Sequence, residues 1–200
     1  MKLKIKELSG VCSVNKDTKR LAEIASVYKK NKILDLGTGT GYCGIWLAKQ
    51  GVNVDATDIN RKAIHCTKIN SKLNNVKMNI FFSDLFKNII DKYDLIIYNP
   101  PVNDNETDFQ RRIKAILRKS PLKNLMSKLA IKIYKKKRVN SLNYFISEAK
   151  KYLIKDGVLL IHIFINDIKY LNKESISLKQ KEKVFSHTAI YEIKYKNKLT

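Results

Sequence analysis

At 200 residues, the chain has room for one α/β domain with a proper core and too little for two. Its longest apolar run, Val158 to Ile165, is far shorter than the ~20 residues of a membrane-spanning helix, and the charged start lacks the apolar centre of a signal peptide. The three cysteines show neither a CxxC pair nor metal-ligand spacing, which favours buried thiols in a reducing cytosol. We therefore expect a cytoplasmic protein with no metal and no membrane association.

The net charge is strongly positive, at +22 from 40 Lys+Arg and 18 Asp+Glu. Such an excess attracts nucleic acid, ribosomes or other anionic surfaces over long range. Lysine, isoleucine and asparagine are all abundant and alanine is scarce, as expected of a chain encoded by an A/T-rich genome. The position of the charge is therefore more informative than its total.

Strand and helix patterns alternate along the chain. In order, we expect an edge strand at 3–5, a helix at 18–29 capped by Asp17 or Thr18, a strand at 32–36, a helix at 42–49, a strand at 52–57, a helix at 60–73, strands at 76–82 and 93–98, a helix at 141–153, a strand at 158–165 entered through a turn at 155–157, and a hairpin of 183–186 with 190–195. This alternation predicts an α/β fold with a mostly parallel sheet, helices on both faces and an antiparallel hairpin at the end.

A glycine-rich loop, DLGTGTG, runs from Asp35 to Gly41 directly after a predicted strand. Glycines let a backbone approach a ligand closely, and the following helix presents free N–H groups to it. The spacing is GxGxG, with Tyr42 where the dinucleotide-binding fingerprint would place its third glycine. The Asp35 carboxylate suits a ligand that carries an ammonium group better than one that carries a pyrophosphate.

Two further aspartates follow predicted strands. Asp58 ends the second strand of the repeating unit, where a carboxylate can accept hydrogen bonds from both hydroxyls of a ribose. Asp84 follows the third, where it could accept from an adenine amino group while Leu85 covers the ring. Either residue alone could be an ordinary loop aspartate. Together they lie where open α/β sheets bind ligands, at the carboxyl ends of the strands.

The tripeptide Asn99-Pro100-Pro101 follows the strand at 93–98. Its prolines fix the backbone and have no N–H, so the carbonyl groups of Asn99 and Pro100 point in fixed directions. The Asn99 amide oxygen and the Pro100 carbonyl could each accept one N–H of a planar –NH₂ group and aim the nitrogen's lone pair at a methyl group. Positioning and dipoles would then supply much of the rate. The alternative is a rigid structural turn, since Asn-Pro is a common turn signal.

With these residues, the sequence resembles the class I S-adenosylmethionine-dependent methyltransferases, especially the HemK-like group of small methyltransferase domains. The resemblance runs from Asp17 to about Pro101 and includes the final hairpin, roughly two-thirds of the chain. It implies a Rossmann-like fold with a seven-stranded sheet, S-adenosylmethionine as cofactor, Asn99 and Pro100 as catalytic residues, and an Asp17-Thr18 pair that closes over the cofactor. The implied cofactor contacts are Asp17, Thr18, Asp35, Gly37, Thr38, Gly39, Gly41, Asp58, Ile59, Asp84, Leu85 and Asn99.

The predicted substrate contacts depart from the family pattern. The residue after the prolines is normally an aromatic one that stacks on the target plane, but here it is Val102. Tyr98 or Phe109 could take over that contact, so we expect Tyr98, Pro101, Val102 and Phe109 to bind substrate. The glycine-rich segment that follows this motif in glutamine methyltransferases is absent, so the resemblance does not imply release-factor specificity.

A basic helical insertion is expected at 103–140, within a single methyltransferase domain of residues 1–200. Between Arg111 and Arg138 there are twelve Lys or Arg and no Asp or Glu. Ser120-Pro121 predicts the start of a helix that ends at 135–138, after a shorter helix at 109–117. This segment is interpreted as a cationic lid or recognition arm for RNA, a ribosome or an anionic substrate; the alternative is a solvated amphipathic helix.

Three functions remain open. We favour an N-methyltransferase that acts on RNA or a translation-associated protein; the resemblance also raises a small partner subunit. The second is a small-molecule methyltransferase with the insertion as its lid. The third is a non-catalytic subunit that binds S-adenosylmethionine or RNA. Val102 in place of an aromatic residue is compatible with this function, whereas the intact Asn99-Pro100-Pro101 argues against it. His65, His162 and His187 are scattered, and we expect core or surface roles for them.

Overall fold

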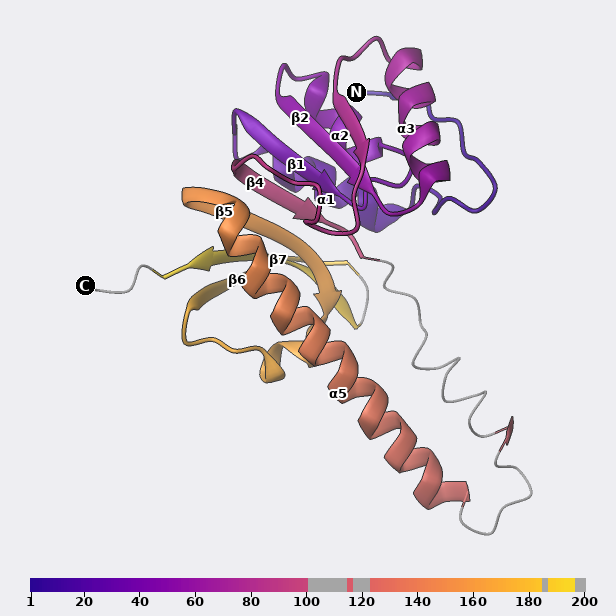
Figure 1. Ribbon diagram of the computed structural model, residues 1–200, viewed down its shortest axis with the longest axis vertical. Helices are drawn as coiled ribbons and strands as arrows, with labels where there is room; N and C mark the ends of the chain where they lie inside the picture. The colour runs from indigo at the N-terminus through magenta and orange to yellow at the C-terminus, as the bar shows by residue number, and fades with distance from the viewer. Residues whose placement is uncertain (101–114, 117–122, 185–186, 197–200) are drawn as a thin grey trace.

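The computed structural model describes residues 1–100, 115–116, 123–184 and 187–196 (Figure 1). Within them, one seven-stranded sheet has the order β3-β2-β1-β4-β5-β7-β6. The strands are β1 (Lys32–Leu36), β2 (Asn53–Asp58), β3 (Asn79–Phe82), β4 (Tyr93–Tyr98), β5 (Leu153–Phe164), β6 (Ile176–Lys183) and β7 (Thr188–Tyr195). β1 to β5 pair in parallel, and β7 pairs antiparallel with both β5 and β6. The predicted mostly parallel sheet with a final hairpin is confirmed, but the first strand of the hairpin is β6 at Ile176–Lys183 and not 183–186 as predicted.

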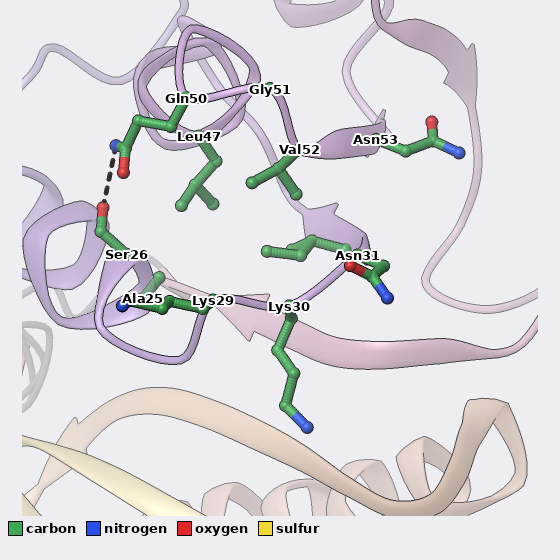
Figure 2. A pocket seen from close by; sticks show the side chains of 11 residues that line it. Ala25, Ser26, Lys29, Lys30, Asn31, Leu47, Gln50, Gly51, Val52 and Asn53 are labelled. Carbon is green, nitrogen blue, oxygen red and sulfur yellow. Dashed lines mark hydrogen bonds between the residues drawn. The ribbon is translucent and has the colours of Figure 1, made fainter.

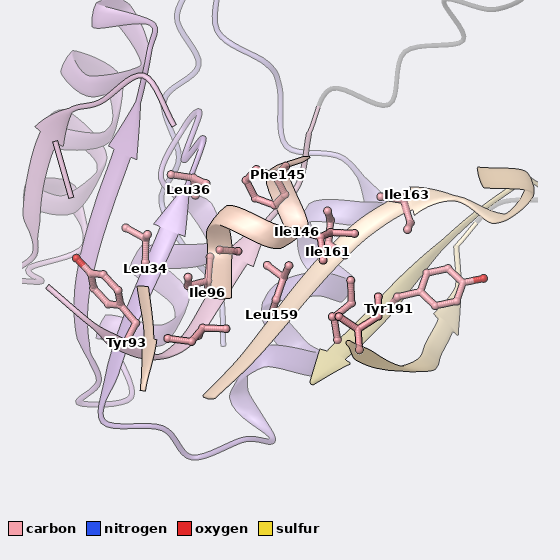
Figure 3. Close-up of a cluster of buried hydrophobic side chains, with 14 of the residues drawn as sticks. Leu34, Leu36, Tyr93, Ile96, Phe145, Ile146, Leu159, Ile161, Ile163 and Tyr191 are labelled. Carbon is pink, nitrogen blue, oxygen red and sulfur yellow. The ribbon is translucent and has the colours of Figure 1, made fainter. Parts of the chain in front are cut away.

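Helices cover both faces of this sheet, as predicted. They are α1 (Lys16–Ser26), α2 (Tyr42–Ala48), α3 (Arg61–Leu73) and α5 (Lys123–Ala149), with 3₁₀ turns at Lys150–Tyr152 and Ile165–Tyr170. Alternate strand residues enter two cores: Ile33 packs with α1 and α2, and Leu34 packs with the end of α5 around Phe145 (Figure 3). A parallel sheet buried on both faces needs such continuous apolar strands.

The expected edge strand at 3–5 is wrong, because residues 1–8 form no strand. Their backbone groups bond instead to asparagine side chains of α3 and its C-cap. Lys4 N donates to Asn74 Oδ1 at 3.0 Å, and Lys6 N donates to Asn70 Oδ1 at 2.8 Å. Backbone polar groups need partners, and here a helix supplies them in place of a neighbouring strand.

The helix predicted to end at 135–138 and the helix predicted to begin at residue 141 are one continuous helix, α5. No glycine or proline lies between Lys123 and Ala149, and basic residues favour a helix end without terminating the helix. Its first turns project beyond the sheet (Figure 1). The predicted helix start at Ser120-Pro121 lies outside the described residues, as does most of the helix predicted at 109–117, of which Ala115 and Ile116 are helical.

The turn predicted at 155–157 is also wrong, because these residues lie inside β5. Asp156 has a positive φ of 63°, and the pairing of β5 with β4 shifts register between Tyr93 and Leu95. The Asp156-Gly157 pair therefore makes an irregularity within a longer strand rather than a turn before a shorter one.

Asn70 ties the N-terminal segment to the glycine-rich loop. Its side chain is fully buried, and its Nδ2 donates to both Lys6 O (2.9 Å) and Thr40 O (2.8 Å). Among the described residues, the Asn74 side chain makes no hydrogen bond to the glycine-rich loop: its Nδ2 donates to Lys4 O at 2.7 Å and to Asn70 O at 2.8 Å. Asn70 thus couples two segments that are far apart in the sequence.

We predict that Asn70→Leu lowers the free energy of unfolding by about 1–3 kcal/mol, because several buried backbone groups lose their partners. Amide hydrogen exchange should become faster both in the N-terminal segment and in the loop around Thr40. Asn74→Leu is the matched control and should loosen only the N-terminal segment. Unchanged exchange around Thr40 in Asn70→Leu would contradict the coupling.

Candidate active site

The carboxyl ends of the first four strands open into a cavity of about 700 Å³. This volume suits a small organic ligand of nucleoside size or larger. Its walls come from five separate parts of the chain. They are Gly10, Val11, Cys12, Ser13, Asn15, Asp17 and Thr18; Leu36, Gly37 and Gly39; Asp58, Ile59, Asn60 and Ala63; Ser83, Asp84 and Leu85; and Tyr98, Asn99 and Pro100.

The glycine-rich loop adopts a backbone that other residues reach only with strain. Gly37, Gly39 and Gly41 all have positive φ, at 69°, 58° and 84°. At Gly41 a side chain is excluded by contact as well, since a Cβ there would lie 2.7 Å from Thr67 Cγ2. The loop therefore needs glycine to turn from β1 into α2 while its backbone faces the cavity.

Asp35 holds this loop from the inside. Its Oδ2 accepts hydrogen bonds from Thr38 Oγ1 at 2.6 Å and from Gly44 N at 2.9 Å, and the residue is 5% exposed. Burial raises the pKa of this carboxyl to about 6, although both hydrogen bonds act in the opposite direction. Asp35, Thr38 and Gly41 are not among the cavity-lining residues, so the contact of Asp35 with an ammonium group stays a prediction.

Asp58 lines the cavity with its carboxylate fixed by backbone groups. Gly39 N donates to Oδ2 at 3.0 Å, and Asn60 N donates to Oδ1 at 2.8 Å. Each carboxylate oxygen retains further capacity to accept. The aspartate is therefore held in one orientation and can still receive two hydroxyl groups of a ligand.

Leu85 has strained backbone at the rim of the cavity. Its φ is +49°, and the buried Ser83 stabilises the turn by donating its hydroxyl to Leu85 O at 2.6 Å. The Leu85 and Ile59 side chains stay exposed, at 38% and 60%. Asp84 beside them pairs with Lys87 at 2.6 Å. This rim offers apolar surface with a carboxylate next to it, which suits a flat ring that carries an amino group.

Asp17 of α1 and Asn99, which follows β4, both line the cavity. Asp17 is 6% exposed, and its Oδ1 has no hydrogen-bond partner among the described residues. Burial raises the pKa of this carboxyl. Asn99 lies next to it, with Nδ2 donating to Thr18 Oγ1 at 3.2 Å and Oδ1 3.0 Å from His162 Nδ1. The cap of α1 is Asn15, so the prediction of Asp17 or Thr18 as N-cap is wrong.

A second cavity, of about 240 Å³, shares Leu85, Tyr98 and Pro100 with the first. Its remaining lining is Arg138, Ser141, Leu142, Phe145, His162, Ile163, Phe164 and Asp167. The Tyr98 and Phe145 rings contact each other at 4.4 Å between centroids, which gives this space an aromatic wall. Pro100 therefore lines both cavities, whereas Asn99 lines the larger one and has its Oδ1 3.0 Å from Nδ1 of His162, which lines the smaller one.

The basic residue Arg138 belongs to the wall of the second cavity. Its Nε and one terminal nitrogen donate to both carboxylate oxygens of Asp167, at 2.9 and 2.7 Å, and its guanidinium lies over the Phe164 ring. The charge pattern predicted that Arg138 belongs to a cationic lid or recognition arm. The bidentate pair shows a structural role that the spacing of charges could not reveal.

Part of the larger cavity is formed by residues that no sequence motif indicated. Residues 10–13 cover it, and Gly10 has a φ of +83°. The Ser9-Gly10 dipeptide was a usable turn signal there. For His162 the sequence predicted only a core or surface role, because no local pattern connects it to Asn99. The predicted substrate residues Pro101, Val102 and Phe109 lie outside the described residues, whereas Tyr98 lines both cavities.

A third cavity, of about 460 Å³, lies at the opposite ends of β1 and β2 (Figure 2). Lys29, Lys30 and Asn53 are among its lining residues, and Gln50 Nε2 donates to Ser26 Oγ across it at 3.0 Å. None of the predicted site residues lines it. In the described part of the chain, no helix is long and apolar enough to cross a membrane, and no cluster of three or more His, Cys, Asp or Glu could hold a metal ion.

Comparison with known proteins points to one family. Residues 2–128 match the family model of the methyltransferase small domain. The chain is 42% identical over 106 residues to the ribosomal RNA small subunit methyltransferase C of Buchnera aphidicola subsp. Cinara cedri, covering 50% of this chain and 31% of that protein. It is 28% identical over 156 residues to the release factor glutamine methyltransferase of Lactococcus lactis, covering 76% and 58%. The chain thus spans less than two-thirds of either relative.

The fold is similar to that of a 16S rRNA N2 methyltransferase of T. thermophilus, solved with AdoMet and guanosine. The TM-score is 0.62 at 14% sequence identity, covering 94% of this chain and 45% of that chain. At this identity the likeness extends to the fold alone.

We predict that Asp35→Asn changes how stability depends on pH. A carboxyl whose pKa rises on folding, here from 3.8 to about 6, stabilises the fold fully below the lower value and loses that contribution as pH rises through the upper one. Relative to the wild type, Asp35→Asn should therefore gain about 2–3 kcal/mol in the free energy of unfolding between pH 4 and pH 7. Urea unfolding at several pH values measures this difference.

The exposed carboxyl variant Asp156→Asn removes the same charge at a surface position and serves as the control. A difference between Asp35→Asn and wild type that stays constant with pH would show that Asp35 does not titrate in this way.

Proposed function

Because the chain belongs to the methyltransferase small domain family, we propose that it is an S-adenosylmethionine-dependent methyltransferase that acts on a planar amino or amide nitrogen in RNA or in a translation-associated protein. The observation that carries this proposal is the position of Asn99 and Pro100 directly after β4, where Asn99 lines the larger cavity and Pro100 lines both cavities. The larger cavity has the size for the cofactor and carries the carboxylates of Asp17, Asp58 and Asp84, and the smaller cavity has an aromatic wall for the acceptor.

The residues of the larger cavity fit S-adenosylmethionine. The buried Asp17 carboxylate offers an oxygen without a partner among the described residues, which suits the ammonium group. Asp58 suits the ribose hydroxyls, because its carboxylate faces the cavity and is fixed by Gly39 and Asn60. When bound, this cofactor supplies a methyl group that is activated by a positively charged sulfur.

The adenine side of the fit rests on the rim. Ile59 and Leu85 expose apolar side chains there, and Asp84 places a carboxylate beside them. Binding of an adenine ring would remove these apolar side chains from water, and this burial would contribute favourably to the free energy of binding. This arrangement supports the predicted roles of all three residues.

The acceptor nitrogen is placed by Asn99 and Pro100. The Asn99 amide oxygen and the Pro100 carbonyl accept the two hydrogens of the –NH₂ group, which turns the lone pair of the nitrogen away from its conjugated plane. No strong base is required before attack, because the proton can leave to solvent afterwards. Tyr98 and Phe145 line the smaller cavity and suit a planar group. The similarity to enzymes named for ribosomal RNA and for release factors supports this acceptor class.

The basic segment supplies attraction for an anionic partner in this proposal. Lys128, Lys132 and Lys136 are exposed on α5, and their spacing of four residues places them along one side of the helix. Because α5 follows the Asn99-Pro100 segment and projects beyond the sheet, this row of charge could guide RNA toward the site (Figure 1). We infer that 103–140 acts as a basic insertion in one cytoplasmic methyltransferase domain; a small partner subunit stays a prediction.

We predict that two single variants separate chemistry from cofactor binding. Asn99→Ala should keep the cofactor affinity within a few-fold and lower turnover by about 10²–10³, because it removes an acceptor that orients the nitrogen. Asp58→Ala should weaken cofactor affinity by about 10–100-fold, because it removes the ribose acceptors. Calorimetry gives the affinity, and labelled methyl transfer onto total RNA, total protein and metabolite fractions gives the turnover and the acceptor class.

Wild-type turnover in Asn99→Ala would contradict the proposed mechanism. Unchanged cofactor affinity in Asp58→Ala would show that Asp58 does not bind the ribose. Label found only in metabolites would favour a small-molecule substrate. Absence of transfer in every fraction, with intact cofactor binding, would favour the non-catalytic alternative.

We predict that the basic row on α5 sets the salt dependence of substrate binding. Replacing Lys128, Lys132 and Lys136 together by Gln should reduce the slope of log K against log salt by roughly 2–3, about 0.9 for each lost phosphate contact. The matched control replaces the exposed Lys68, Lys72 and Lys77 of another surface. Equal slopes for the two triple variants would mean that the α5 lysines are only solvated surface.

A further inference from the structure

A chain of hydrogen bonds joins the cap of α1 to the end of β4. The Asn15 side-chain oxygen accepts from Thr18 N at 2.9 Å and from Thr18 Oγ1 at 2.8 Å. The Thr18 hydroxyl has only one hydrogen, so toward any other neighbour it can only accept. It does so from Asn99 Nδ2 at 3.2 Å.

This chain fixes the orientation of the Asn99 amide. Because the nitrogen of the amide faces Thr18, its oxygen must face the opposite side, where His162 Nδ1 lies 3.0 Å away. Two acceptors would repel each other at that distance, so Nδ1 carries the hydrogen and donates it to Asn99 Oδ1. The geometry thus selects one tautomer of the histidine.

The rest of the histidine environment agrees with a neutral ring. His162 is 1% exposed, and its Nε2 has no hydrogen-bond partner among the described residues. A hydrogen on Nε2 would leave a buried donor unsatisfied. Burial, followed by the nearby His187, lowers the pKa of His162 to about 4.

One acidic group also faces this ring. The Asp17 carboxylate of α1 lies 3.7 Å from His162 Nδ1, which is too long for a hydrogen bond. Among the described residues, Asn99 after β4, Asp17 on α1 and His187 before β7 are therefore polar groups that act on the histidine. Of these, Asn99 Oδ1 receives the Nδ1 hydrogen.

A purely structural role in β5 would not explain why position 162 is a histidine. The neighbouring residues of β5, from Val158 to Ile163, are otherwise apolar and buried. A leucine or valine would avoid the cost of burying an imidazole there. The histidine gains one hydrogen bond in return, and that bond is to the asparagine proposed for catalysis.

We propose that His162 is a positioning residue: its neutral ring donates from Nδ1 to Asn99 Oδ1 and, with Thr18, holds the Asn99 amide from both ends. One lone pair of Oδ1 is engaged by the histidine, and the other remains for an N–H of the acceptor. The amide therefore need not become ordered when substrate arrives, which lowers the barrier by pre-organisation. This role rests on the proposed methyl transfer.

The test compares His162→Phe with His162→Asn. Phenylalanine keeps a planar ring but cannot donate, whereas asparagine carries its Nδ2 donor at the same bonded distance from Cβ as histidine Nδ1. We expect His162→Phe to lower kcat by about 10–100-fold with KM and cofactor affinity changed less than about threefold. His162→Asn should recover most of kcat. Thermal unfolding of both variants shows whether either has lost its fold.

A second readout needs no activity. Long-range ¹H–¹⁵N spectra of histidine-labelled wild type should show that His162 Nδ1 is protonated and Nε2 is unprotonated at neutral pH. In Asn99→Ala the Nδ1 hydrogen should exchange faster with water, because its acceptor is gone. An Nε2–H tautomer, or unchanged exchange in Asn99→Ala, would overturn the proposal even where no methyl transfer is detected.

The two readouts separate the possible failures. If wild type transfers methyl groups and His162→Phe turns over normally, the positioning role is wrong while the proposed function stands. If wild type transfers none but the tautomer and exchange results are as expected, the proposed function fails and the hydrogen-bonded arrangement stands without its catalytic purpose. If His162→Asn is as impaired as His162→Phe while both remain folded, the donor is not what matters and the proposal is wrong.

Discussion

Parallel pairing of β1 with β2 and β4 is the constraint on which the site depends. Parallel strands all end at the same edge of the sheet, so residues that follow different strands meet there although they are far apart in the chain. Gly37, Asp58 and Asn99 reach the larger cavity in this way. Two apolar cores, one on each face of the sheet, stabilise this pairing. Parallel strands are typical of sheets that are covered on both faces.

Buried polar side chains then hold in place the loops that meet at this edge of the sheet. Asp35 bonds to Thr38 and Gly44 and holds the glycine-rich loop against α2. Asn70 bonds to Lys6 O and Thr40 O and joins the N-terminal segment to that loop. A buried polar group without a partner costs free energy. Other loop arrangements would break these hydrogen bonds, so they are less stable than the observed one. Asp17 lines the cavity, and its buried Oδ1 has no such partner among the described residues.

The departures from the sequence-based expectations share a physical cause. Residues 3–5 alternate as a strand does, but α3 supplies their partners. The lysine-rich stretch at 135–138 suggested a helix end, but nothing there breaks a helix, and α5 continues to pack Phe145 against the sheet. Asp156-Gly157 suggested a turn, but pairing with β4 extends β5 through it. In each case local pattern gave way to a partner that lies elsewhere in the chain.

The alternation of strands and helices, the glycine-rich loop and the residues after each strand were predictable from the sequence, because these depend on local periodicity and on backbone freedom at Gly37, Gly39 and Gly41. From them came the fold, the family and the place of the cavity. Only the tertiary structure decided which side chains meet. His162 reaches Asn99 from sixty-three residues away, and Arg138 is paired with Asp167 rather than free in a cationic patch. The physical reason is that hydrogen bonds and ion pairs act over a few ångströms in space, and that distance is set by strand order rather than by spacing along the chain.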